Sequence, residues 1–128
     1  DILELTSLKN VFRSHFFLNQ EKLEMKLFYE ILIEMKMETD KFGGELLFVY
    51  VPSWSRYFTK YNKDKILFNK KDEILSFLKK EKIIFYDFEN EISNSSNKKE
   101  YFPLGYMGHF NSFGYKKLSD SIIKLINK

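Results

Sequence analysis

The chain has 128 residues and a net charge of +3, and 44% of its residues are hydrophobic, a balance too apolar for a disordered chain. The absence of cysteine excludes disulfides, zinc–thiolate sites and thiol nucleophiles. The longest apolar runs fall far short of the roughly 18 residues that a transmembrane helix needs. Charged residues stand near the start, where a signal peptide would be apolar. We therefore expect one domain with neither a membrane span nor a signal peptide.

The positive charge comes almost entirely from lysine, since Arg13 and Arg56 are the two arginines. Arginine recognises phosphate and guanine through paired hydrogen bonds, whereas scattered lysines more often keep a surface soluble. We therefore expect no nucleic-acid partner. The two histidines, His15 and His109, lie far apart in the sequence, and no calcium-loop pattern is present. We expect no metal and no cofactor.

The N-terminal third of the chain predicts two helices. A weak helical pattern covers residues 3–13, and a stronger one runs from Asn19 or Gln20 to about Lys41. Gly43 and Gly44 supply the stop signal. The stronger helix carries an apolar stripe that recurs every four residues: Leu23, Leu27, Ile31 and Met35.

Two apolar runs predict buried strands. The first covers residues 46–51 and ends at Pro52, and the second covers residues 83–86 and ends at Asp87. A long loop over residues 53–68 and a helix that Asn69 caps are expected between them. The rest of the chain is predicted to form these elements: a long loop over residues 88–110, then a helix from about Phe113 to Ile126 that Asn111 or Ser112 caps.

The order helix, strand, helix, strand, helix predicts parallel strands joined by right-handed crossovers. The fold class is therefore α/β, with helices on both faces of the sheet. Two strands are few for such a sheet, because both of its edges stay open. The chain also begins with Asp1 rather than methionine. We expect residues 1–128 to be a single α/β domain or the C-terminal part of a larger one, which would associate with its missing N-terminal half or with another copy.

Ligands of open α/β sheets collect beyond the carboxyl ends of the strands. Ser53 and Trp54 follow the first predicted strand, and Asp87 ends the second. The loop before the last helix carries His109 between glycine-rich segments, where an imidazole is useful as a general base. By position alone, a structural histidine bonded to a nearby carbonyl is the more frequent case.

The run Gly-His-Phe-Asn-Ser-Phe-Gly-Tyr, residues 108–115, precedes an amphipathic helix and resembles the last conserved block of the SGNH (GDSL-type) hydrolases. Residues 46–53 and 83–88 are similar to strands of the same family, and the resemblance covers roughly residues 20–128. It implies a flavodoxin-like three-layer α/β/α fold with a parallel sheet. It also implies cleavage or transfer of ester-linked acyl or acetyl groups on a small-molecule, carbohydrate or lipid substrate, with His109 as the catalytic base.

The chain departs from the family pattern in two ways. Tyr106 stands three residues before the histidine, where the family has an aspartate that orients the imidazole. A backbone carbonyl, Glu100 or Asp87 could take that role, and Asp87 is our candidate; the alternative for Asp87 is a cap on its own backbone. The Gly-Asp-Ser block and the oxyanion blocks are missing, and Ser53 lacks the strand-to-helix turn that presents a nucleophile. We expect this chain alone to be inactive.

Under the hydrolase interpretation, Ser53, Trp54 and Tyr57 would border the substrate pocket. The alternative for these aromatic residues is a packed loop that covers the sheet edge. The alternative function is a non-catalytic α/β binding domain or a degenerate SGNH-like protein, which the tyrosine at position 106 favours.

Overall fold

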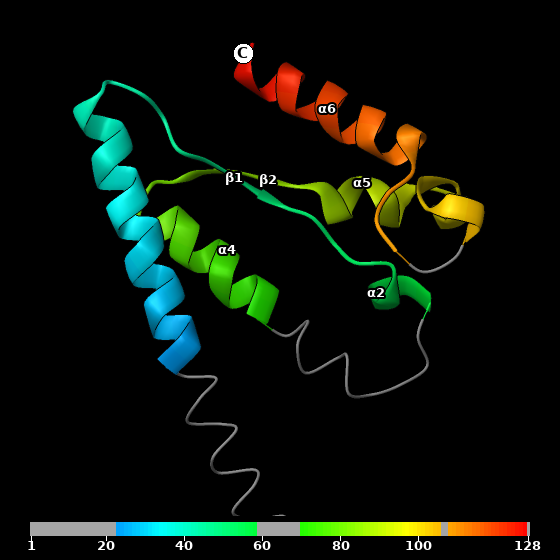
Figure 1. Cartoon of the computed structure of the whole chain (residues 1–128), viewed down its shortest axis with the longest axis horizontal. Coiled ribbons are helices and arrows are strands. Elements are labelled where there is room, and N and C mark those ends of the chain that lie inside the picture. Colours follow the sequence, from blue (N-terminus) through cyan, green and yellow to red (C-terminus); the bar gives the residue numbers. More distant parts are fainter. Residues whose placement is uncertain (1–22, 59–69, 106–107, 128) are drawn as a thin grey trace, which may run out of the picture. The chain divides into compact units, whose positions relative to one another are not determined.

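The computed structural model describes residues 23–58, 70–105 and 108–127. The chain divides into two compact units, Asp1–Gly44 and Glu45–Lys128 (Figure 1).

The described part of the first unit contains a helix over residues 23–41. It is followed by Gly43 in the left-handed region, with φ of 69°, a conformation that glycine adopts without a steric penalty. The predicted long helix and its glycine stop are thus confirmed. The weak helix predicted over residues 3–13 and the histidine at position 15 lie outside the described residues.

The second unit is a mixed α/β structure in which helices predominate. Its elements, in chain order, are β1 (Leu47–Tyr50), α2 (Ser55–Phe58), α4 (Lys70–Lys80), β2 (Ile84–Asp87), α5 (Phe88–Asn94), the 3-10 helices η1 (Lys98–Tyr101) and η2 (Pro103–Gly105), and α6 (Ser112–Ile126).

The two strands form a small parallel sheet, in which Leu47 is opposite Ile84 and Tyr50 is opposite Asp87. Parallel neighbours need a long crossover connection, and the chain between β1 and β2 contains α2 and α4. The predicted strand pairing is therefore confirmed. Because the strands run parallel and in register, both carboxyl ends lie at the same edge, and the segments that leave them start side by side.

Helix α4 begins with acidic residues in its first turn and ends with lysines in its last, as the helix dipole favours. Lys82 follows in the left-handed region with φ of 55°, and the Ile83 N–H donates to the Leu78 carbonyl at 2.9 Å. This turn leads straight into β2. The predicted helix between the two strands is confirmed, and its predicted cap, Asn69, lies outside the described residues.

The loop predicted over residues 88–110 is wrong, because this segment contains α5, η1 and η2. Helix α5 is only seven residues long, too short to show a helical period. The Asp87 side chain caps it by accepting a hydrogen bond from the Glu89 N–H at 3.1 Å. The loop predicted over residues 53–68 likewise starts with the single turn α2, and its residues from 59 onward lie outside the described part.

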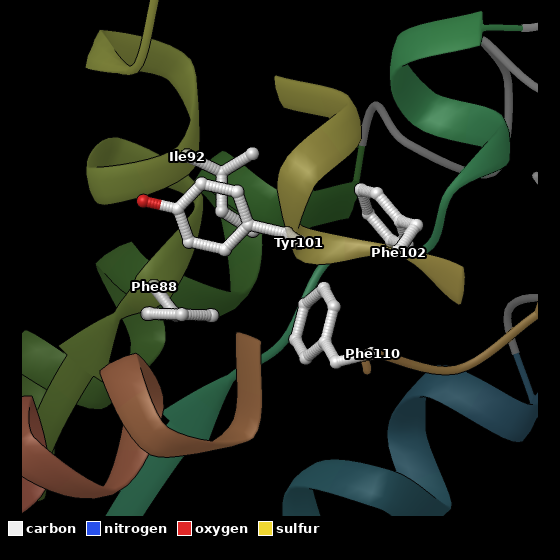
Figure 2. Packing of buried hydrophobic residues seen from close by; sticks show 5 residues of the cluster. All are labelled: Phe88, Ile92, Tyr101, Phe102 and Phe110. Atoms are coloured by element: carbon white, nitrogen blue, oxygen red, sulfur yellow. The ribbon is translucent and has the colours of Figure 1, made fainter. Parts of the chain in front are cut away.

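A cluster of buried hydrophobic residues in this unit begins directly after β2. Phe88, the first residue after β2, is fully buried, and the ring of Phe110 packs edge-on against it at 5.4 Å between centroids (Figure 2). Such aromatic pairs add about 0.5–1.5 kcal/mol to the free energy of burial. The buried cluster consists of Phe88, Ile92, Tyr101, Phe102 and Phe110. It forms a rigid base for the segments that surround the sheet edge.

Candidate functional site

A cavity of about 360 Å³ opens at the carboxyl end of β1. One wall is the segment that leaves the strand, and the other is the loop before α6. Ser53 and His109 both line this cavity, and both side chains are exposed to solvent. The lining residues are Val51, Pro52, Ser53, Gly108, His109, Phe110 and Tyr115. The two polar side chains thus face an otherwise largely apolar pocket, which we call the His109 pocket.

Asn111 fixes the wall of the pocket that carries His109. Its side-chain oxygen accepts from the Gly114 N–H at 2.9 Å, which caps α6, and its side-chain amide donates to the carbonyls of Glu100 and Phe102 at 2.8 and 3.2 Å. Its own N–H donates to the Tyr101 carbonyl at 2.9 Å. Of the two predicted caps, Asn111 and Ser112, Asn111 is the one that caps α6. This one residue joins the start of α6 to the segment around η1.

Phe110 and Gly114 complete this support. The Phe110 side chain is 7% exposed and lies in the buried cluster, directly after His109 in the chain. Gly114 is buried, and a Cβ atom there would stand 2.7 Å from the Tyr101 carbonyl oxygen. The Phe, Asn and Gly of the sequence pattern are therefore used for packing and capping. His109 lines the pocket together with Gly108, Phe110 and Tyr115 of the same pattern, and its imidazole is exposed.

Within the described ranges, no hydrogen bond or ion pair involves the His109 imidazole. Asp87, the predicted orienting carboxylate, does not line the pocket; it caps α5 and binds Lys71 at 2.6 Å. The Glu100 carboxylate accepts from the Ser95 hydroxyl at 3.1 Å. Tyr106 lies outside the described residues. Asp87 therefore caps its own backbone at the start of α5, which was the alternative prediction for this residue. That Asp87 orients His109 stays a prediction.

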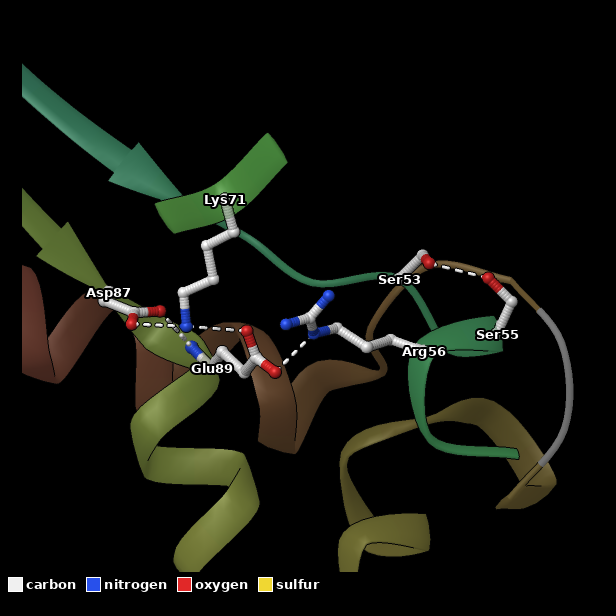
Figure 3. A network of polar contacts seen from close by, with 6 residues as sticks. All are labelled: Ser53, Ser55, Arg56, Lys71, Asp87 and Glu89. Atoms are coloured by element: carbon white, nitrogen blue, oxygen red, sulfur yellow. Dashed lines mark hydrogen bonds and ion pairs between the residues drawn. The ribbon is translucent and has the colours of Figure 1, made fainter. Parts of the chain in front are cut away.

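A cluster of four charged side chains gathers around the end of β2 (Figure 3). Lys71 on α4 binds Asp87 at 2.6 Å and Glu89 at 2.7 Å, and Arg56 on α2 binds the other oxygen of Glu89 through its Nε. The four side chains are 9–19% exposed, so their attraction is screened far less than that of a surface pair. We call these residues the Arg56–Glu89 cluster.

The electrostatics of this cluster favour the ionised forms. Burial by itself raises the pKa of Glu89, but hydrogen bonds from Arg56 and Lys71 outweigh it, so the pKa is lowered. Burial lowers the pKa of Lys71, yet its hydrogen bonds to Asp87 and Glu89 leave that pKa raised. The cluster therefore pairs two cations with two anions at neutral pH. It is suited to holding elements together rather than to transferring a proton.

The sequence did not reveal this cluster. Asp87 and Glu89 follow a predicted strand, which was a visible signal, but Lys71 is one of many lysines and precedes them by a whole helix. Only the crossover geometry brings α4 and α2 to the end of β2. Tyr115, in the first turns of α6, also lines the pocket and was not among the predicted site residues.

Ser53 lies on the first wall of the pocket and is followed by a helical turn. The Arg56 N–H donates to the Ser53 carbonyl at 3.2 Å, and the Ser53 and Ser55 hydroxyls are hydrogen bonded at 2.8 Å. The four-residue helix α2 starts at Ser55, two residues after Ser53. Ser53 is placed, as predicted, at the sheet edge that faces His109.

Trp54 and Tyr57 do not line the His109 pocket. Both pack against the buried aromatic cluster, and the ring centroids of Trp54 and Phe58 are 5.2 Å apart. Burial raises the pKa of Tyr57. These contacts agree with the alternative prediction, in which the aromatic residues form a packed loop. A role of Trp54 and Tyr57 in substrate binding stays a prediction.

Among residues 23–58, 70–105 and 108–127, no helix is both long and apolar enough to cross a membrane. The same residues contain no group of three or more histidine, aspartate or glutamate side chains placed to hold a metal ion. Comparison with protein-family models, curated proteins and solved structures finds no match to this chain.

Proposed function

We propose that this chain carries the general-base part of an SGNH-type serine hydrolase, which cleaves or transfers ester-linked acyl groups. The observation that carries the proposal is the exposed imidazole of His109 in a pocket at the carboxyl end of β1. Three other residues of the sequence pattern support this wall: Phe110 packs in the buried cluster, Asn111 caps α6, and Gly114 packs closely against Tyr101. An imidazole at the carboxyl edge of a parallel sheet, exposed in a pocket, meets the geometric criteria for a candidate general base.

In the proposed reaction, a serine hydroxyl attacks the ester carbonyl while His109 accepts the hydroxyl proton. The carbonyl carbon becomes tetrahedral, the alcohol leaves with the proton that His109 returns, and water then releases the acyl group by the reverse sequence of proton transfers. The nucleophile and the oxyanion donors come from outside this chain. Within the chain, Ser53 and Tyr115 border the space that the ester would occupy.

The proposed fold is a three-layer α/β/α domain in which further strands extend the two-stranded sheet. Parallel sheets are normally covered on both faces and contain more strands than two. Helix α6 also exposes apolar side chains along its length, among them Tyr115, Ile123 and Ile126 at 51, 52 and 68% exposure. A larger sheet would give this face a partner.

The test is hydrolysis of p-nitrophenyl acetate by the protein that contains this chain together with the sequence encoded before Asp1. His109→Ala is expected to lower kcat at least about 100-fold, the usual contribution of a general base. His15→Ala is the matched control and is expected to keep wild-type turnover. Labelling by a fluorophosphonate, which reacts with activated serines, is expected to fall in parallel. Wild-type turnover in His109→Ala would contradict the proposal.

A non-catalytic α/β binding domain is the second candidate. It is favoured by the His109 imidazole, which has no carboxylate partner in the described part of the chain. A base that nothing orients is a weak catalyst. This candidate predicts no ester hydrolysis and no fluorophosphonate labelling, whatever residue stands at position 109.

A further inference from the structure

Arg56 contacts two segments that lie far apart in the sequence. Its backbone N–H donates to the Ser53 carbonyl at 3.2 Å, at the wall of the His109 pocket. Its side chain binds Glu89, in the first turn of α5 after β2. Arg56 therefore connects the pocket wall that leaves β1 to the end of the neighbouring strand (Figure 3).

Glu89 is a fixed anchor for this connection, because both of its carboxylate oxygens are engaged. One oxygen binds Arg56, and the other binds Lys71 at 2.7 Å. Lys71 also binds Asp87 at 2.6 Å, and Asp87 accepts from the Glu89 N–H at 3.1 Å. The Glu89 side chain is 12% exposed, so water competes little for these contacts.

The two walls of the pocket are thus held by two different sets of contacts. Asn111 and Gly114 fix the wall with His109, and the Arg56–Glu89 cluster fixes the wall with Ser53. A pocket whose walls come from separate segments keeps its shape only if both are anchored to the same rigid frame. Here both walls connect to the start of α5: the ring of Phe88 packs against Phe110 and Tyr101 on the His109 side, and Glu89, the next residue, binds Arg56 on the Ser53 side.

We propose that Arg56 is a positioning residue that sets the distance between the Ser53 wall and His109, and that it acts through Glu89. This inference rests on the proposed hydrolase function for its effect on turnover, but its effect on pocket geometry is measured independently. A displacement of about 1 Å in an active site can lower a rate about 100-fold. Arg56→Gln is therefore expected to lower kcat about 10- to 100-fold with a much smaller change in KM.

Two spectroscopic signals report the pocket without any turnover. Trp54 directly follows Ser53, so acrylamide quenching of its fluorescence, assigned by its loss in Trp54→Phe, reports the first wall. The ring ¹H–¹³C resonance of His109, assigned by its loss in His109→Ala, reports the second. Arg56→Gln is expected to increase the quenching of Trp54 and to shift the His109 resonance, and Glu89→Gln is expected to do the same.

The design includes one double variant, one conservative variant and one control. Because Arg56 acts through Glu89, the Arg56→Gln/Glu89→Gln double variant is expected to be no worse in kcat than the more affected single variant. Arg56→Lys keeps the charge but not the fork geometry and is expected to restore part of kcat. If Arg56→Gln does not unfold cooperatively, Arg56→Lys replaces it in the kinetic and spectroscopic measurements. Lys116→Gln, which breaks an exposed pair with Asp120 on α6, is the matched control and is expected to match wild type.

The outcomes separate the two proposals. If wild type hydrolyses no ester but Arg56→Gln still changes both spectroscopic signals, the hydrolase function fails and the positioning role stands. If a cooperatively folded Arg56→Gln keeps wild-type quenching, the wild-type His109 resonance and wild-type kcat, the positioning role is overturned. Additive losses in the double variant would also overturn it, because they would mean that the two residues act separately.

Discussion

Gly114 lets α6 approach the main-chain carbonyl of Tyr101 so closely that a Cβ atom at position 114 would lie 2.7 Å from that oxygen. The same carbonyl accepts a hydrogen bond from the Asn111 N–H at 2.9 Å, so it cannot move away without breaking that bond. The Phe110 Cβ would also be only 2.9 Å away. The glycine of the sequence pattern is thus required by packing rather than by backbone conformation, since it lies within a helix.

Gly114→Ala is therefore expected to destabilise the protein. Alanine favours a helix over glycine by about 1 kcal/mol, but overpacking against fixed backbone costs about 1–3 kcal/mol and here is expected to exceed that gain. Chemical denaturation measures the free energy of unfolding. Ser119→Ala, an exposed substitution on the same helix, is the control and is expected to stay within about 0.5 kcal/mol of wild type. A Gly114→Ala variant more stable than wild type would show that α6 can shift freely.

Asn111 combines two functions that a pair of substitutions can separate. Asn111→Ala removes the cap of α6, worth about 1 kcal/mol, and the two bonds to the carbonyls of Glu100 and Phe102, worth about 0.5–1.5 kcal/mol each. Asn111→Asp keeps the oxygen that caps the helix but loses the donor to those carbonyls. We expect Asn111→Asp to lie between wild type and Asn111→Ala in free energy of unfolding. Equal losses in both variants would mean that the carbonyl contacts contribute the whole effect.

The parts of the fold that could be predicted are those with a strong local signal. Two apolar runs with a helical segment between them predicted the parallel strands. The short polar side chain of Asn111, placed just before a segment with helical periodicity, predicted the cap of α6. Helix α5 and the 3-10 turns were missed because each is too short to show a period. For a segment of seven residues, tertiary packing of Phe88 and Ile92 decides the structure, and packing cannot be read from local pattern.

Of the predicted site residues, His109 and Ser53 line the pocket, whereas Asp87, Trp54 and Tyr57 do not. His109 and Ser53 were placed at the sheet edge by the general rule for parallel sheets, and they do line one pocket. The partners of Asp87 could not be predicted, because Lys71 reaches it from a helix that the crossover returns to the same edge. A sequence with so many lysines gives no reason to single out one of them.

Phe88 is expected to be a major contributor to stability in the second unit. Its side chain is fully buried and contacts the rings of Phe110 and Tyr101 at centroid distances of 5.4 and 6.1 Å. Phe88→Ala is expected to lower the free energy of unfolding by about 3–5 kcal/mol, because the cavity adds to the lost burial. Phe113→Ala, where the ring is 38% exposed, is the control and is expected to cost clearly less. Similar losses at both positions would contradict the packing described for the cluster.

Stability is expected to fall in acid because of Glu89. The pKa of Glu89 is lowered in the folded state, so its ion pairs stabilise the fold above its ordinary value of 4.5, and this contribution is lost as the pH falls through the lowered value. The contribution of Lys71 to stability depends on pH in the opposite direction. The pKa of Lys71 is raised in the folded state, so its contribution is complete below pH 10.5 and is lost as the pH rises through the folded-state pKa. The cluster therefore stabilises the fold most fully between about pH 5 and pH 10.

Glu89→Gln isolates the acid limb of this dependence. It leaves Lys71 paired with Asp87 and removes the Glu89 carboxylate from Arg56, and it is expected to lower the free energy of unfolding at pH 7 by about 1–3 kcal/mol, as when a partly buried charged hydrogen-bond partner is removed. Below pH 4 the difference from wild type is expected to shrink, because protonation removes the same charge from Glu89 itself. Glu73→Gln, which alters an exposed pair with Lys70, is the control and is expected to follow wild type at every pH. A constant difference between Glu89→Gln and wild type from pH 7 to pH 3 would show that the Glu89 charge does not stabilise the fold.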